Sequence, residues 1–312
     1  MKRRTFIRNA SILGAGAGLG GFIPNAYASA GNQIRVTILH TNDTHSHLEP
    51  LPESVPKYAG MGGVARRAAL VRQIRKENPD SLLLDAGDVF HGTPYFNKYK
   101  GALNFEIMSK MGYDATTIGN HEFDNGVSGF EKVMDKASFP FVTSNYDFGS
   151  TRMGFQVQKF IIRRVGGVKI GIFGLGVNFE NLVLPHLHRG VRYLDPFEIS
   201  SDMVDRLKSY HQCDMVICLS HIGYRYNDDR VSDRVVAEKV DGIDLIIGGH
   251  THTFMDEPEL FEKRDGSRTW ISQVGFAGIV LGRMDFYFDR DRTIAGMTHN
   301  NHAVSGRSDN ST

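Results

Sequence analysis

The chain has 312 residues, of which 41% are hydrophobic and 23% are charged, an ordinary composition for a globular protein. Its 36 basic and 35 acidic residues nearly balance, so no excess of positive charge favours a nucleic acid polymer or an anionic membrane as partner. The length allows one large α/β domain or two small ones.

The first 30 residues predict an export signal. A basic start, MKRRTFIRNA, leads into a short Gly/Ala-rich apolar run that ends in the small residues Ala28-Ser29-Ala30. The run is too short to span a membrane. The pair Arg3-Arg4 is typical of twin-arginine signals, and a plain Sec signal is the alternative. We therefore expect an exported, periplasmic protein.

After the signal, short apolar runs alternate with segments of helical spacing. The runs with strand character cover residues 34–40, 81–84, 115–118, 141–144, 169–173, 215–219 and 245–247. Apolar residues recur at helical spacing within residues 64–74, 105–108 and 130–137. This alternation predicts an α/β fold with a buried sheet. We expect one folded domain over residues 31–292 and a polar C-terminal tail over residues 293–312.

The later part of the chain changes in character. Residues 155–172 contain the turn RVGG and predict a hairpin, and residues 281–289 alternate apolar and polar side chains as a half-exposed strand does. These segments predict a second sheet that is partly antiparallel.

Residues with metal-ligand chemistry directly follow five of the apolar runs. They are Asp43 and His45, Asp88, Asn120 and His121, His221, and His250 and His252. Each alone is more often a turn or capping residue. Because ligands of α/β sheets bind beyond the carboxyl ends of the strands, their repetition at five strand ends predicts one metal site. Such side chains suit Zn²⁺, Mn²⁺ or Fe, and a pair of ions bridged by a carboxylate can activate water for attack on phosphorus.

Five sequence blocks carry a family resemblance. The blocks ILHTNDTHSHLEP, DAGDVFHGTP, TIGNHEFDNG, SHIGY and GGHTHT resemble those of the calcineurin-like metallophosphoesterases, and most closely those of the catalytic domain of the 5'-nucleotidase family. The resemblance extends over residues 34–289. It implies a four-layer αββα sandwich with mixed sheets and a dinuclear centre of two divalent ions, which could be Zn, Mn, Fe or Co.

The resemblance also implies a role for each matched residue. One ion takes Asp43, His45, Asp88 and His252, and the other takes Asp88, Asn120, His221 and His250, so that Asp88 bridges them. His121 is implied to be catalytic and to contact the phosphoryl group rather than a metal, while Asp124 fixes its orientation.

Three further residues lie within or near these blocks without an implied role in the chemistry. We expect Glu122 to be structural, and we expect His91 and Asn145 to line the substrate pocket.

The implied reaction is hydrolysis of a phosphate ester, most closely that of a 5'-nucleotidase-like phosphomonoesterase, with a metal-bound hydroxide in in-line attack on phosphorus. A cyclic-nucleotide or other phosphodiesterase is one alternative. A non-catalytic metal-binding half that scaffolds a separate subunit is another.

The substrate specificity stays open at this level. Two-domain 5'-nucleotidases hold the nucleobase with a C-terminal domain, and from the position of Thr312 as the last residue we expect this chain to have no room for one. A separately encoded C-terminal domain could complete the site, the enzyme could act alone on small phosphate esters, or the substrate could be unrelated to nucleotides.

Overall fold

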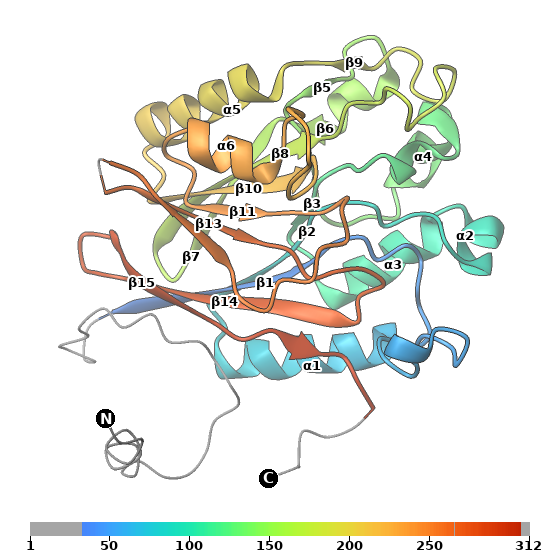
Figure 1. Ribbon diagram of the computed structural model, residues 1–312, viewed down its shortest axis with the longest axis horizontal. Coiled ribbons are helices and arrows are strands. Elements are labelled where there is room, and N and C mark those ends of the chain that lie inside the picture. The colour runs from blue at the N-terminus through green and yellow to red at the C-terminus, as the bar shows by residue number, and fades with distance from the viewer. Residues whose placement is uncertain (1–32, 265, 307–312) are drawn as a thin grey trace, which may run out of the picture.

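The computed structural model describes residues 33–264 and 266–306 of the chain (Figure 1). The expected export signal and the last six residues lie outside the described ranges. Figure 1 shows two sheets packed face to face between two layers of helices. The expected four-layer αββα sandwich is therefore confirmed.

The first sheet has the strand order β15-β14-β1-β2-β3-β4-β6, and β16 also pairs with β14. Its strands are β1 (Ile34–Thr41), β2 (Ser81–Asp85), β3 (Ala115–Thr116), β4 (Phe141–Val142), β6 (Val157–Gln158), β14 (Val280–Phe288), β15 (Ile294–His299) and β16 (His302–Ala303). Strands β1, β2, β3, β4 and β6 run parallel, and β14 lies antiparallel to β1. The carboxyl ends of β1, β2 and β3 consequently meet at one edge.

The second sheet has the order β12-β13-β11-β10-β8-β7. Its strands are β7 (Phe160–Val165), β8 (Val168–Gly176), β10 (Met215–His221), β11 (Leu245–Ile247), β12 (Glu259–Glu262) and β13 (Arg268–Ser272). Strands β7 and β8 form the expected hairpin. A separate pair joins β5 (Tyr146–Asp147) to β9 (Arg192–Tyr193). Each expected strand run contains a strand, and a second, mixed sheet forms as expected. The placement of residues 281–289 in that sheet is wrong, because they form β14, which pairs with β1 of the first sheet.

Helices cover the outer face of each sheet. They are α1 (Val64–Glu77), α2 (Pro94–Tyr99), α3 (Ala102–Met111), α4 (Gly126–Met134), α5 (Pro196–Asp205) and α6 (Asp233–Lys239). Shorter turns of helix are η1 (Pro56–Tyr58), η2 (His121–Phe123), η3 (Arg152–Phe155) and η4 (Arg206–Tyr210). None of the helices in the described part of the chain has the length and apolar character that crossing a membrane requires.

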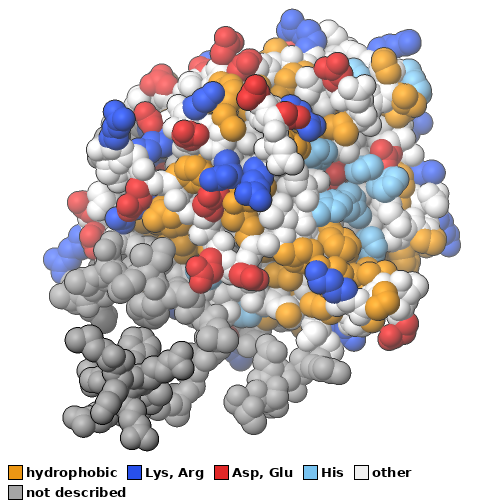
Figure 2. Space-filling view, viewed as in Figure 1, with side chains coloured by type: hydrophobic (Ala, Val, Ile, Leu, Met, Phe, Trp, Pro, Cys, Tyr) orange, Lys and Arg blue, Asp and Glu red, His pale blue; other side chains and the backbone are white. Residues whose placement is uncertain are grey.

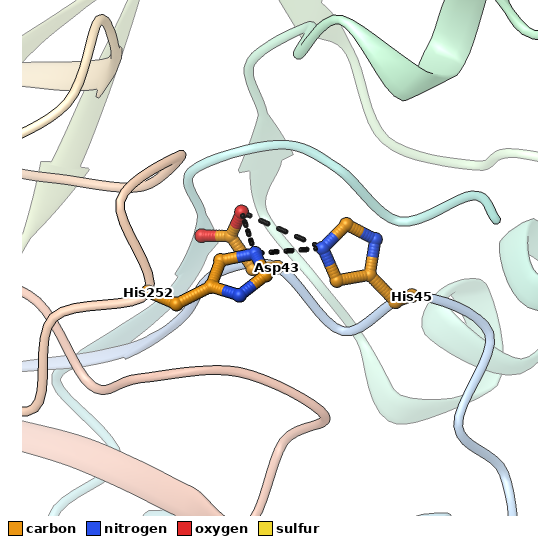
Figure 3. A group of neighbouring side chains, drawn as sticks. All are labelled: Asp43, His45 and His252. Atoms are coloured by element: carbon orange, nitrogen blue, oxygen red, sulfur yellow. Dashed lines mark hydrogen bonds and ion pairs between the residues drawn. The ribbon is translucent and has the colours of Figure 1, made fainter. Parts of the chain in front are cut away.

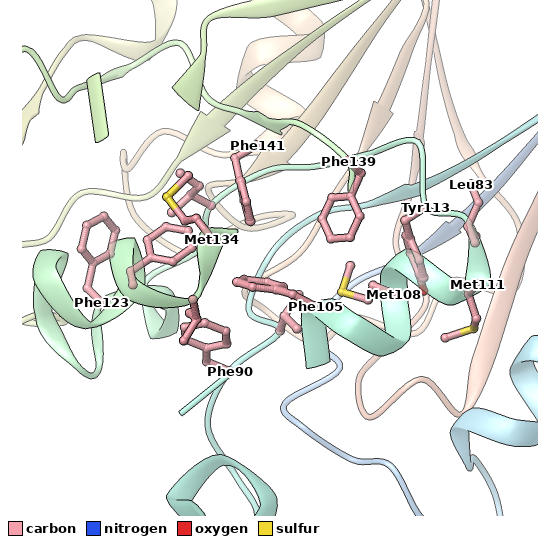
Figure 4. Packing of buried hydrophobic residues seen from close by; sticks show 14 of the residues in the cluster. Leu83, Phe90, Phe105, Met108, Met111, Tyr113, Phe123, Met134, Phe139 and Phe141 are labelled. Carbon is pink, nitrogen blue, oxygen red and sulfur yellow. The ribbon is translucent and has the colours of Figure 1, made fainter. Parts of the chain in front are cut away.

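Three apolar cores separate the four layers. Alternate residues of β10 serve two of them, because successive side chains of a strand point to opposite faces. Ile217 and Leu219 pack between the sheets, whereas Val216 and Cys218 pack toward α5 and α6. The third core, beneath α1, α3 and α4, is rich in aromatic side chains, and Figure 4 shows Phe90, Phe105, Phe123, Phe139 and Phe141 within it.

The end of the chain differs from the expected tail. Residues 294–299 form β15, which pairs antiparallel with β14, and residues 302–303 form β16. Met297 is buried against the core between the sheets. The first sheet therefore continues past residue 292, because β14 offers an edge that a following strand can pair with.

Candidate metal centre

The predicted ligands converge at one edge of the sandwich. Asp43, Asp88 and Asn120 follow β1, β2 and β3 of the first sheet. His221 ends β10 of the second sheet, and His250 and His252 follow β11. The parallel direction of these strands brings their carboxyl ends together, as expected. Two groups form: Asp43, His45 and His252, and Asp88, His221 and His250.

The backbone of this edge is held in an unusual conformation. Asp43, His45, Asp88, His250 and His252 all have positive φ, between 45° and 69°. This left-handed region is uncommon for residues other than glycine and costs energy that the surrounding structure must supply. Because this conformation is concentrated at predicted ligands, we infer that it serves to direct their side chains into the site.

The first group brings three ligand atoms together (Figure 3). His252 Nε2 lies 3.2 Å from Asp43 Oδ1, and His45 Nε2 lies 3.7 Å from the same oxygen. The two Nε2 atoms are 2.9 Å apart. His45 Nδ1 lies 3.0 Å from the carbonyl oxygen of Phe90, to which it can donate, so that Nε2 carries a lone pair. Lone pairs and a carboxylate facing one another favour a cation between them.

The second group contains a buried nitrogen without a hydrogen bond. His221 Nδ1 lies 2.6 Å from the carbonyl oxygen of Ala86, a hydrogen bond that directs Nε2 into the site. Nε2 is 3.0 Å from Asp88 Oδ2, yet it makes no hydrogen bond to any described residue. Burial disfavours the charged imidazole, but the Asp88 carboxylate outweighs burial and raises the pKa of His221 to about 10. The buried Asp88 carboxylate therefore favours a positive charge beside it, which a metal ion would supply in place of the imidazole proton.

His250 and Asn120 complete the second group. His250 Nδ1 lies 2.9 Å from Asn120 Oδ1. Burial and the nearby His221 lower the pKa of His250 to about 4, which favours the neutral imidazole that binds metals. The backbone N–H of His250 donates to both carboxylate oxygens of Asp43, at 3.1 and 3.0 Å. These hydrogen bonds connect the second group to the first. Together the imidazole nitrogens, carboxylate oxygens and amide oxygen of the two groups fit a pair of divalent ions.

Glycine forms the floor of the centre. A Cβ atom at Gly119 would lie 2.2 Å from Asp88 Oδ1, and one at Gly249 would lie 2.8 Å from His221 Nδ1. No other residue fits either place without displacing the side chain above it.

Glu122 holds two of the ligand loops together, in agreement with its expected structural role. Its buried carboxylate accepts hydrogen bonds from the backbone N–H groups of Asp88 at 3.0 Å, Val89 at 2.7 Å and Gly119 at 2.7 Å. Burial raises the pKa of Glu122 to about 7, and the Asp88 carboxylate adds to the increase. The residue connects the loop after β2 to the loop after β3 and so fixes Asp88 relative to Asn120.

His121 and Asp124 form the expected pair. His121 Nδ1 lies 3.0 Å from Asp124 Oδ2, and the backbone N–H of His121 donates to Asp88 Oδ1 at 2.8 Å. Donation from Nδ1 to a carboxylate leaves Nε2 as the nitrogen available to a ligand.

His91 contacts both members of this pair. Its Nδ1 lies 2.7 Å from the same Asp124 oxygen, and its ring stacks on that of His121 with centroids 4.3 Å apart. Histidine side chains gather visibly on one face of the molecule, beside an apolar region (Figure 2).

Asn145 does not line a pocket, contrary to expectation. The residue is fully buried, and its side-chain amide pairs with the backbone of Gly176, donating to the carbonyl at 2.8 Å and accepting from the N–H at 2.7 Å. Both ends of the amide are thus used to join the β4–β5 connection to the end of β8, so Asn145 is a structural residue.

An aromatic group next to the centre was not foreseen from the sequence. Phe276 stacks on His252 with centroids 5.5 Å apart, and Tyr58 and Phe254 pack against it. Phe254 follows His252 by two residues, which was an available signal. Tyr58 is distant in sequence, and only the fold brings it to this place.

Comparisons with known proteins agree with the geometry. A family model described as calcineurin-like phosphoesterase matches residues 36–254. The chain is 32% identical over 286 residues to the trifunctional nucleotide phosphoesterase protein YfkN of Bacillus subtilis, covering 81% of this chain and 18% of that protein. It is 34% identical over 275 residues to the 5'-nucleotidase of Bos taurus, covering 81% of this chain and 46% of that protein.

A solved structure gives the same relation. The 5'-nucleotidase precursor from Thermus thermophilus superimposes with a TM-score of 0.78 at 30% identity, covering 86% of this chain and 54% of that chain. The chain thus spans less than half the length of the two curated relatives and about half of this structure.

Proposed function

The chain belongs to the calcineurin-like phosphoesterase family, and from this premise we propose that it is a dimetal phosphomonoesterase that acts on 5'-nucleotides. One observation carries the proposal: two contiguous groups of metal ligands lie beside a histidine that a carboxylate orients. A purely structural metal site has no need of the His121–Asp124 pair. The names of the relatives, 5'-nucleotidase among them, support the nucleotide as substrate.

We assign the ligands by the two groups. Asp43, His45, Asp88 and His252 would hold one ion, and Asp88, Asn120, His221 and His250 would hold the other. The bound ions would supply Lewis acidity toward the phosphate and a nucleophilic water at neutral pH. The mixed nitrogen and oxygen donors are compatible with Zn, Mn, Fe or Co.

His121 would act on the phosphoryl group directly. Asp124 accepts the Nδ1 proton of His121, and in the imidazolium form the second proton, on Nε2, would be donated to the oxygen of the leaving group. His91 shares Asp124 and stacks on His121, and it would line the same space as a second imidazole. Asp124 would therefore fix the tautomer and orientation of both rings.

The test is a substrate panel on the purified chain loaded with Mn²⁺ or Zn²⁺. It contains AMP, other 5'-mononucleotides, 2',3'-cyclic AMP and bis-p-nitrophenyl phosphate. We expect kcat/KM for 5'-mononucleotides to exceed that for the cyclic nucleotide and the diester by at least tenfold. Preference for the diesters would make the protein a phosphodiesterase. Absence of hydrolysis with both ions bound would favour a non-catalytic subunit, and a separately encoded C-terminal domain would then be sought.

We also infer export through the twin-arginine route from the Arg3-Arg4 pair and the apolar run after it. The similarity to a protein described as a 5'-nucleotidase precursor is in keeping with export. Fractionation of expressing bacteria tests the inference: a mature protein in the periplasm supports it, and a full-length protein retained in the cytoplasm contradicts it.

A further inference from the structure

A pocket of about 530 Å³ lies beside the predicted ligand His250. Its walls come from the segment after β8, from the start of α5 and from the β10–α6 connection. Because the pocket reaches the metal centre, a molecule whose phosphate lies on the ions could extend into it. A volume of this size accommodates a small organic ligand.

The pocket has a fixed aromatic wall. The hydroxyl of Tyr226 donates to the carbonyl oxygen of Ile222 at 2.8 Å, and the guanidinium of Arg230 lies 4.3 Å from the ring centroid of Tyr226. A Cβ atom at Gly223 would lie 2.3 Å from the Tyr226 hydroxyl, so the glycine admits the tyrosine. Tyr193 contributes a second ring to the lining. Such rings offer apolar faces to a flat ligand without a large entropic cost.

The pocket also has an acidic lining. Glu180, Asp195 and Asp229 line it, and the cation of Arg230 is paired with Asp228 at 2.9 Å. Asp195 uses only Oδ1 for the hydrogen bonds that cap α5. Carboxylates accept hydrogen bonds from sugar hydroxyls, as in sites that bind ribose. They repel additional phosphate groups, so the lining favours an uncharged polyol over an anionic one.

We propose that this pocket is the subsite for the alcohol part of the substrate and that it takes an uncharged nucleoside, so that monophosphates are preferred over nucleoside diphosphates. The inference rests on the proposed function. The aromatic group of Tyr58, Phe254 and Phe276 beside His252 is the competing location. The rings of that group pack on one another, and the ring centroids of Tyr58 and Phe254 are 5.3 Å apart. The pocket beside His250 offers about 530 Å³ for a ligand, so we place the subsite there.

Filling the pocket tests the proposal. Asn178 is exposed and lines the pocket, so Asn178→Trp should block it without disturbing the core. In the metal-loaded enzyme we expect kcat/KM for AMP to fall at least tenfold, mainly through KM. Glycerol 3-phosphate has too short an alcohol to use the pocket, and its kcat/KM should change less than twofold. An equal loss for both substrates, or no loss for AMP, would overturn the proposal.

Two matched variants and a binding measurement complete the design. Glu238→Trp places the same side chain at an exposed position of α6 and should leave both substrates unaffected. A loss of AMP turnover in Phe254→Ala but not in Asn178→Trp would move the subsite to the aromatic group and overturn the proposal. If the unsubstituted protein hydrolyses neither substrate, the proposed function fails separately. Calorimetric titration with adenosine then decides: binding that Asn178→Trp abolishes supports the pocket, and unchanged or absent binding overturns it.

Discussion

Histidine rings at the metal centre are positioned by a hydrogen bond at one ring nitrogen, which leaves the other ring nitrogen directed at the site. His45 and His221 each use Nδ1 on a backbone carbonyl and present Nε2 to a carboxylate. His121 uses Nδ1 on Asp124. In His45 and His221 the carboxylate near Nε2 belongs to a predicted metal ligand, Asp43 or Asp88. In His121 the carboxylate is Asp124, which is not a predicted ligand, and it binds Nδ1 instead.

Replacing His121 separates these roles. In His121→Ala we expect both ions to be retained and kcat for AMP to fall by about 10² to 10⁴, because a positioned acid or base contributes about that much. Metal content by mass spectrometry and steady-state kinetics measure the two effects. His186 is an exposed histidine outside the candidate ligand groups, so His186→Ala is the matched control and should leave both unchanged. Loss of metal together with turnover would show that His121 acts as a ligand.

At the scale of elements, α3 supports the loop that carries Asp88. Phe105 on α3 is fully buried and contacts Phe90 and Phe141, with ring centroids 5.1 and 5.0 Å away. Phe90 follows Asp88 by two residues, so the aromatic core beneath the first sheet continues directly into the metal centre (Figure 4).

Truncating Phe105 should therefore destabilise the domain strongly. We expect Phe105→Ala to lower the free energy of unfolding by about 3 to 5 kcal/mol, the usual cost of removing a buried phenylalanine. Phe155, with 99% of its surface exposed, provides the matched control, and Phe155→Ala should change stability by less than ~0.5 kcal/mol. Urea denaturation of the metal-free variants measures both. Equal effects in the two variants would contradict the placement of α3 over this core.

For the whole molecule, the metal centre connects the two sheets. The ligands Asp43, Asp88 and Asn120 belong to the first sheet, and His221, His250 and His252 belong to the second. Bound ions would thus add a link between layers that are otherwise joined by the apolar core between the sheets.

Chelation should consequently lower the melting temperature as well as abolish activity. Ions present at about 1,000 times their Kd stabilise the folded state by about 4 kcal/mol. For a domain of this size we expect Tm to fall by ~10 °C in EDTA, as measured by calorimetry. The Asp88→Asn variant should already melt at the lower temperature and respond little to EDTA. An unchanged Tm in the original protein would argue that the ions do not bridge the sheets.

The sequence by itself determined the alternation of strands and helices. It also determined which candidate metal ligands follow the carboxyl ends of the strands. This was possible because strand periodicity and the exits of parallel strands are local properties, and because the histidines and carboxylates of the five blocks have few other reasons to recur there. Strands β15 and β16 were not foreseen, since pairing depends on the free edge that β14 offers and not on their own composition.

Only the tertiary structure decided which polar residues face the site. From the sequence, Asn145 and His91 were both expected to line the substrate pocket, yet the Asn145 amide is hydrogen-bonded to the backbone of Gly176 and His91 stacks on His121. The sharing of Asp124 by two histidines, the aromatic group beside His252 and the pocket beside His250 likewise join segments far apart in the chain. Such contacts depend on how the layers pack, and packing is set by the whole sandwich rather than by any segment of it.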